Sequence, residues 1–201
     1  MNHPKITLTL ALLATLRTSP STAQNAAASR PLQLSAFGAA TGVYTGFEGG
    51  KNFLITAGGD LELIPLHGVR PAIEVRGSYP VDGGNISSER SVLGGLKLEF
   101  LIHHRLRPYG DFLFGRGQMN YSSNSGLNGF IYNGYGYNLT TTYVDSPGFG
   151  IDYQFSPHLA LKLDGQYQRW ASVPTSSGVI YSKVGSAGLI YYFTFDRRRS
   201  R

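Results

Sequence analysis

The sequence predicts an all-β fold, an eight-stranded antiparallel up-and-down transmembrane β-barrel, and three observations support this prediction. Glycine supplies 26 of the 201 residues and aromatic residues 12%, a composition typical of short strands and tight turns. From residue 32 onward the apolar residues recur with a period of two, which indicates strands with one apolar and one polar face. No apolar run reaches the roughly 18 residues that a membrane-spanning helix needs.

The first 23 residues have the pattern of an export signal peptide. A basic start that includes Lys5 precedes an apolar stretch over residues 6–16, and small residues then lead to Ala23. We expect cleavage after Ala23, and Arg17 leaves the exact position open. A retained anchor is the alternative, for which the apolar stretch is short. A short N-terminal lead is expected over 24–31, a single barrel domain over 32–195 and a basic C-terminal tail over 196–201.

The predicted strands share the same alternation of faces. In the third strand Ile73 and Val75 alternate with Glu74 and Arg76, and the fourth and seventh strands repeat this pattern. The first strand is ambiguous, because small residues at positions 38–40 blur its alternation. The eight strands are predicted over residues 32–46, 52–64, 69–79, 89–102, 107–121, 139–155, 158–171 and 178–195.

The predicted connections alternate in character along the chain. Short connections are expected at 65–68, 103–106 and 156–157, and longer ones rich in Gly, Ser and Asn at 47–51, 80–88, 122–138 and 172–177. Short turns at one end and longer loops at the other are typical of outer-membrane barrels, whose turns face the periplasm. We use "turn end" and "loop end" for these two ends below.

The polar faces of the strands carry charges of both signs at mid-strand. In a membrane barrel these residues point inward, and eight strands leave only enough room for side chains, so the sequence predicts a paired ionic interior. Two alternatives remain open: a soluble lipocalin-like barrel with its polar face outside, and a narrow channel that favours cations, because seven of these residues are acidic and three basic. The residues are Asp60, Glu62, Glu74, Arg76, Lys97, Glu99, Asp111, Asp152, Lys162 and Asp164.

The last predicted strand has aromatic residues at alternate positions, Tyr191, Phe193 and Phe195. With the segments 107–117 and 148–161, this strand resembles the small outer-membrane β-barrel family, the eight-stranded OmpA-like group. The resemblance covers essentially all of residues 32–195. It implies a barrel in a bacterial outer membrane and recognition of the three aromatic residues by the barrel assembly machinery. The chain departs from the family pattern at the tail 196–201, which follows the usual terminal aromatic residue. We expect no cell-wall-binding domain after the barrel.

Residues suited to catalysis or metal binding are sparse. The chain has no Cys and no G-x-S-x-G sequence, and His67, His103, His104 and His158 all fall in or directly beside predicted short turns. Adjacent residues of extended chain point to opposite sides, so His103 and His104 are poorly placed to chelate one metal ion. We expect no catalytic residue, metal site or cofactor. A lipid-modifying enzyme remains the alternative, because the residues of a triad need only meet in space.

Two sets of residues are candidates for binding. Four basic residues near the loop end occupy the alternate strand positions that face lipid, and we expect them to contact lipopolysaccharide phosphates. The alternative is that these strand ends extend beyond the membrane into water. Aromatic residues of the longest loop suit surface recognition or a simple strand extension. The basic set is Arg90, Arg116, Arg169 and Lys183, and the aromatic set is Tyr121, Phe130, Tyr132, Tyr135 and Tyr137.

The positive charge of the chain does not indicate nucleic-acid binding. The formal net charge is +6, and much of it lies in the tail 196–201 instead of on one basic face. The expected partners are therefore outer-membrane lipid, lipopolysaccharide and the barrel assembly machinery. The sequence favours a structural or surface-interaction role in a bacterial outer membrane over catalysis.

Overall fold

The computed structural model describes residues 32–45, 50–82, 88–100, 102, 105–121, 130–133, 135–171, 173 and 175–193. Side chains are described at these positions except at 82 and 130–132. The predicted signal peptide, the N-terminal lead up to residue 31, Phe195 and the basic tail lie outside the described residues. Within the described residues no helix has the length and apolar character of a membrane span.

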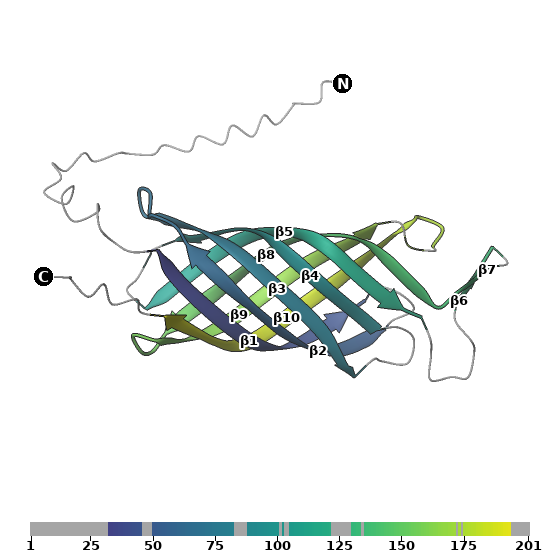
Figure 1. Cartoon of the computed structure of the whole chain (residues 1–201), viewed down its shortest axis with the longest axis horizontal. Coiled ribbons are helices and arrows are strands. Elements are labelled where there is room, and N and C mark those ends of the chain that lie inside the picture. The colour runs from purple at the N-terminus through teal and green to yellow at the C-terminus, as the bar shows by residue number, and fades with distance from the viewer. Residues whose placement is uncertain are drawn as a thin grey trace, which may run out of the picture. The chain divides into compact units, whose positions relative to one another are not determined.

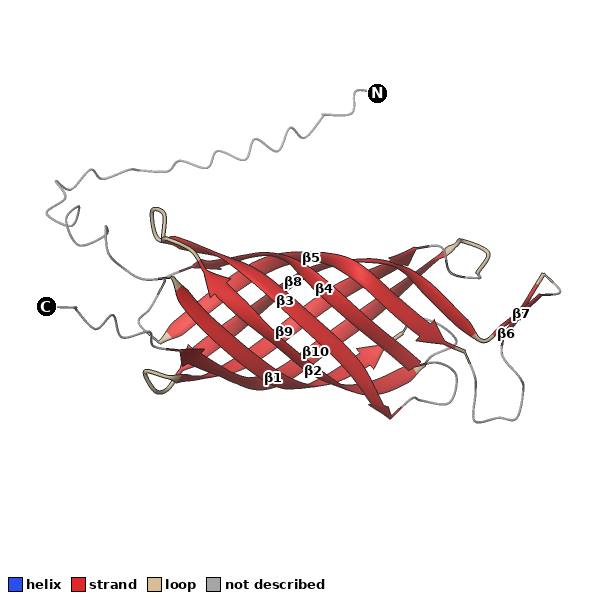
Figure 2. Cartoon of the chain, in the orientation of Figure 1, coloured by secondary structure: helices blue, strands red, loops and turns tan. Residues whose placement is uncertain are grey.

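Eight long strands close into one antiparallel barrel (Figures 1 and 2), which confirms the predicted fold class. Their order around the barrel is β1-β10-β9-β8-β5-β4-β3-β2, so only the β1–β10 pair joins strands distant in sequence. The strands are β1 (Gln33–Tyr44), β2 (Lys51–Glu62), β3 (Val69–Asp82), β4 (Ser88–Phe100), β5 (Leu106–Asn120), β8 (Leu139–Gln154), β9 (Leu159–Ala171) and β10 (Val179–Phe193).

A short hairpin interrupts the connection between β5 and β8. It consists of β6 (Phe130–Tyr132) and β7 (Tyr135–Tyr137), and it extends beyond the loop end of the barrel (Figure 1). Asn133 between the two strands has a φ of 51°, a left-handed conformation that Asn tolerates better than most residues. The sequence predicted this segment as a loop, with a strand extension as the alternative for its aromatic residues.

β3 extends three residues beyond its predicted end at Tyr79. A proline follows, and proline weakens a strand prediction because it has no N–H for the ladder. In the structure the pairing of β2 with β3 shifts between Phe53 and Leu54: Leu54 pairs with Pro80, and Phe53 with Asp82. This irregularity absorbs Val81 as an extra residue, so β3 continues beyond its proline.

The side chains of the barrel are arranged with their polarity inverted relative to a soluble barrel. Glu74 and Lys97 are fully buried in the interior, whereas Val75 is 53% and Phe149 74% exposed on the outer surface. The first strand follows the same rule without a break, with residues 37, 39, 41 and 43 inside and residues 38, 40, 42 and 44 outside. Its outward positions are mostly small, which is why its alternation is hard to recognise in the sequence.

Candidate functional site

Ion pairs cross the interior of the barrel. Arg76 on β3 donates to Asp164 on β9, which lies on the opposite side, with 2.9 Å between Nη1 and Oδ1. The same guanidinium pairs with Glu74 and lies 3.4 Å from Asp111 on β5. Each of these four side chains is less than 10% exposed. One arginine thus links three separate strands through the centre of the barrel.

A second buried cation, Lys97, contacts carboxylates from other strands of the barrel. Lys97 Nζ on β4 lies 2.8 Å from Asp152 Oδ2 on β8, 3.0 Å from Glu99 Oε1 and 3.1 Å from Asp60 Oδ2 on β2. An ammonium group has three N–H donors, so these carboxylates match its donor capacity. The three carboxylates offset the hydration that the ammonium group loses on burial, and removing any one of them would leave that loss less compensated.

Two aromatic rings separate the buried cations. Lys162 Nζ lies 4.6 Å from the centre of the Phe37 ring and 4.5 Å from the centre of the Tyr109 ring, and Lys97 Nζ lies 4.2 Å from the latter. The Tyr109 hydroxyl donates to Asp164 at 2.8 Å. Cation–π contacts of this kind replace part of the hydration that the ammonium groups lose on burial. The sequence did not identify either ring as part of the interior.

All ten charged residues predicted to face inward are buried within the barrel, as expected. The structure adds Arg70, Glu89 and Arg107, which brings the described interior to eight acidic and five basic side chains. Each added residue is the second of its strand. Side chains from opposite strands meet in the middle of the barrel, which agrees with a filled interior at this strand number.

Apolar residues fill the interior near the loop end. Trp170 is 1% exposed and packs among side chains from four other strands and the adjoining loops. The cluster consists of Leu93, Leu113, Met119, Tyr121, Val144, Trp170, Val173 and Ile180, with Tyr137 packed against it. Burial raises the pKa of Tyr121 to about 12, so its hydroxyl stays neutral at physiological pH.

Glu89 is a buried carboxylate at the loop end. Its Oε1 accepts a hydrogen bond of 2.9 Å from the Ser182 hydroxyl, which comes from β10 on the opposite side of the barrel. Within the described residues no cation lies within 4.0 Å of Glu89. The two described histidines, His67 and His158, lie in connections at the turn end, at the other end of the barrel from this pair.

The four basic residues of the predicted belt all point outward, but their surroundings differ. Arg169 pairs with Asp145 at 3.1 Å, so its charge is compensated. Arg116 donates to the Tyr143 hydroxyl at 3.1 Å and stacks 4.9 Å from the centre of that ring. Lys183 lies in register between tyrosines of β1 and β9, and Arg90 makes no ion pair with any described residue.

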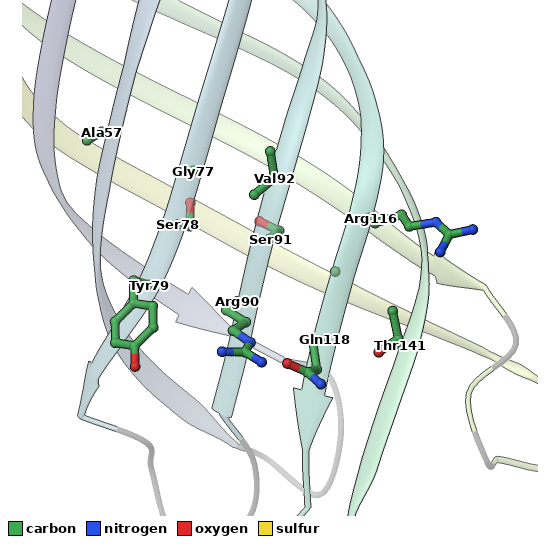
Figure 3. Close-up of a pocket in the computed structure, with 11 residues that line it drawn as sticks. Ala57, Gly77, Ser78, Tyr79, Arg90, Ser91, Val92, Arg116, Gln118 and Thr141 are labelled. Carbon is green, nitrogen blue, oxygen red and sulfur yellow. The ribbon is translucent and has the colours of Figure 1, made fainter.

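Arg90 and Arg116 border a groove on the outer surface of the barrel (Figure 3). The groove has a volume of about 500 Å³. Its lining includes Ala57, Gly77 and Val92, with Tyr79, Gln118 and Thr141 closer to the loop end (Figure 3). The sequence did not indicate the groove, because it depends on which outward residues become neighbours across β2, β3, β4, β5 and β8.

The aromatic residues of the longest connection do not form one exposed surface. Tyr121 is 2% exposed and belongs to the apolar cluster, so the prediction that it takes part in surface recognition is wrong: it follows β5 with inward parity. Tyr135 is 71% exposed and Tyr137 partly buried. The side chains of Phe130 and Tyr132 lie outside the described residues.

Outward aromatic residues end the last strand. Tyr191 and Phe193 are exposed on β10 and meet edge to face, with ring centres 5.1 Å apart. His158 stacks on Tyr191 at 6.1 Å, so it has a packing partner in the adjoining turn. His103 and His104 lie outside the described residues.

Comparison with known proteins supports the fold. No protein-family model and no curated protein matches the chain. Neisserial surface protein A has a TM-score of 0.56 at 15% identity, over 81% of this chain and 97% of that one. Ail, the attachment invasion locus protein of Yersinia pestis, has a TM-score of 0.45 at 13% identity, over 82% of this chain and 100% of that one. The outer membrane enzyme PagL has a TM-score of 0.43 at 13% identity, over 81% of this chain and 99% of that one.

Proposed function

We propose that the protein is a β-barrel of a bacterial outer membrane, exported by its N-terminal signal peptide, with a structural or surface-interaction role and without catalysis. The observation that carries this proposal is the inverted polarity of the barrel. Ion pairs fill its interior, while large apolar side chains cover the outside. The outward apolar residues include Val75, Phe112, Phe114, Phe149 and Leu163, each at least 50% exposed.

This polarity favours lipid over water around the barrel. An exposed apolar surface costs about 25 cal/mol per Å² in water and nothing comparable in hydrocarbon. A soluble lipocalin-like barrel would need an apolar ligand pocket inside, where this barrel has Arg76, Lys97 and Lys162 with their carboxylates. Strands of 12 to 16 residues exceed the 9 to 11 or so that a tilted strand needs to cross a bilayer.

The surface of the barrel also supports the proposed partners. Three basic residues near the loop end, Arg90, Arg116 and Lys183, have no ion-pair partner among the described residues and suit the phosphates of lipopolysaccharide in the outer leaflet. Arg169 does not belong to this basic set, because its ion pair with Asp145 neutralises its charge. The outward Tyr191 and Phe193, with Phe195, suit recognition by the barrel assembly machinery.

The placement of the reactive groups that the structure describes supports a role without catalysis. Ser182 and Glu89 meet at the loop end, whereas His67 and His158 lie at the turn end. A Ser-His-acid triad needs all three groups within hydrogen-bond reach. In this proposal the residues near Ser182 fill the interior of the barrel beneath the loops and have no catalytic role.

Membrane fractionation followed by gel electrophoresis, with and without boiling in detergent, tests the proposed function. We expect recovery in the outer membrane and a band whose mobility changes on boiling, because a closed barrel resists detergent until it is heated. Recovery as a soluble periplasmic protein would overturn the proposal. A phospholipase or deacylase assay on the folded protein tests the absence of catalysis, and turnover that Ser182→Ala abolishes would contradict it.

A further inference from the structure

The groove beside Arg90 and Arg116 has room for a ligand. Gly77 forms part of its floor, and a Cβ placed there would meet no non-neighbouring atom closer than the Ser91 carbonyl oxygen at 3.9 Å. Val92 beside it is 65% exposed, and Ala57 completes an apolar floor on neighbouring strands. The groove is therefore an open apolar depression on the lipid-facing side of β2, β3 and β4.

Both arginines at the groove carry a charge that no carboxylate compensates. Arg90 pairs in register with Gln118, and Val92 with Arg116, so the two arginines are diagonal neighbours on adjacent strands. Diagonal neighbours lie roughly 7–8 Å apart, but the Arg116 side chain points toward β8, away from Arg90 (Figure 3). Within the described part of the chain, neither has an acidic partner within 4.0 Å.

The position of Arg116 is fixed before any ligand binds. One of its nitrogens donates to Tyr143, and the guanidinium stacks on that ring, which leaves its other N–H groups free. Gln118 and Thr141 follow on β5 and β8 at the loop end of the groove, and both are polar (Figure 3). The loop end of the groove thus has positive charge and hydrogen-bond donors, and its floor is apolar.

We propose that this groove is a binding site for one lipid A molecule of lipopolysaccharide. Arg90, with Gln118, binds one phosphate of its headgroup, Arg116 binds the other phosphate from the β8 side, and one acyl chain lies over Ala57, Gly77 and Val92. Guanidinium groups bind phosphate through paired N–H donors, which makes this contact stronger and more directional than attraction to a point charge. The site rests on the proposed function, because the loop end must face the outer leaflet.

The arrangement favours a lipid over a free anion or a protein partner. A free phosphate would use the arginines and leave the apolar groove empty. The apolar floor lies nearer the middle of β3 and β4 than Arg90 does, in the part of the outer surface that faces hydrocarbon in the proposed orientation. Only an amphiphile with an anionic head and an alkyl chain matches both halves of the groove.

Binding of bis-phosphorylated lipid A to the folded protein in phosphatidylcholine nanodiscs, measured by native mass spectrometry, tests the site. We expect Arg90→Ala and Arg116→Ala each to weaken binding about tenfold, as loss of a charge-assisted hydrogen bond does. Gly77→Leu fills the groove and is expected to weaken binding by a similar factor. Arg169→Ala and Gly42→Leu are the matched controls, because Arg169 is compensated and a Cβ at Gly42 meets nothing within 4 Å.

Three competitors identify the source of the anion. We expect dephosphorylated lipid A, phosphatidylglycerol and inorganic phosphate each to compete poorly with lipid A. Equal competition by inorganic phosphate or by phosphatidylglycerol would overturn the assignment to lipid A, and equal competition by the dephosphorylated lipid would overturn the role of the arginines. Unchanged binding in the Arg90→Ala, Arg116→Ala double variant would also overturn it, as would an equal loss in Arg169→Ala.

Failure of this site is distinguishable from failure of the proposed function. Each variant is first checked for a heat-shifted band and for recovery in the outer membrane. If both persist while lipid A binding is unaffected by the substitutions, the groove proposal is wrong and the membrane barrel stands. If a variant does not fold, Arg90→Gln with Arg116→Gln keeps an unbranched polar side chain without the charge and gives the same test.

Discussion

Trp170 on β9 packs directly against Gly117 on β5, across the width of β8. A Cβ at Gly117 would meet the indole ring and would lie 2.9 Å from Val144 Cγ2. The glycine therefore makes room for the single tryptophan of the chain, which is also its natural fluorescent probe.

We predict that Gly117→Ala destabilises the barrel because the indole ring must move. Overpacking a filled core costs about 1–3 kcal/mol. Urea unfolding in detergent, followed by Trp170 fluorescence, measures the change, and a shifted emission maximum in the folded state would report the displaced ring. Gly42→Ala is the control, since its new methyl group faces outward with nothing within 4 Å. Equal stability of the two variants would contradict the packing described.

Arg76→Met is expected to be among the most damaging substitutions in the barrel. It leaves Glu74, Asp111 and Asp164 buried without their shared cation, and removing one partner of a buried ion pair costs about 3–5 kcal/mol. Arg169→Met breaks an ion pair whose side chains are 46% and 44% exposed, where the expected loss is about 0–1 kcal/mol. Denaturant unfolding of both variants measures the two losses of unfolding free energy. Similar losses would contradict the prediction.

The free-energy cost of a charged residue on the outer surface should depend on how deep that residue lies in the bilayer. Leu163 lies outward near the middle of β9, and Leu163→Arg is expected to cost about 2–4 kcal/mol in a bilayer. Tyr181 lies outward beside Arg169 near the loop end, and Tyr181→Arg is expected to cost about 0–1 kcal/mol. Folding yield into vesicles, read from the heat-shifted band, compares them. Equal yields would favour a barrel surrounded by water.

Glu89→Gln is predicted to stabilise the barrel. The amide retains a hydrogen bond with Ser182 and removes a buried charge that has no described cation within 4.0 Å. We expect a gain of about 1 kcal/mol at pH 8, the lower part of the range for burying an unpaired polar group. Glu74→Gln is the contrasting variant, because Glu74 pairs with Arg76 and its replacement should destabilise. A loss of stability in Glu89→Gln would indicate a cation near Glu89.

The sequence predicted the strands well because burial on one face imposes a period of two on every strand. It predicted which face of each strand holds charges, and all ten of those residues are inside. It did not identify Arg70, Glu89 and Arg107, each the second residue of its strand, because the alternation has only just begun there. It ended β3 early because the local rule against proline does not anticipate the irregular pairing of β3 with β2 at Val81.

The contacts between strands could not be predicted from the sequence. Arg116 and Tyr143 are 27 residues apart, and only the register of β5 against β8 brings them together. The groove at Gly77 and the compensation of Arg169 by Asp145 depend on register in the same way. Periodicity defines the two faces of a strand, but it does not fix the height of one strand relative to the next.

The ion pair between Arg76 and Asp164 also constrains the order of events during membrane insertion. The two residues are 88 positions apart, so neither meets its partner until β3 and β9 stand on opposite sides of a curved sheet. A flat sheet in hydrocarbon would carry Arg76 and Asp164 without this ion pair, at a cost of several kcal/mol. The nascent sheet must therefore keep its charged face hydrated until β1 pairs with β10, which makes entry into the lipid and closure a single coupled step.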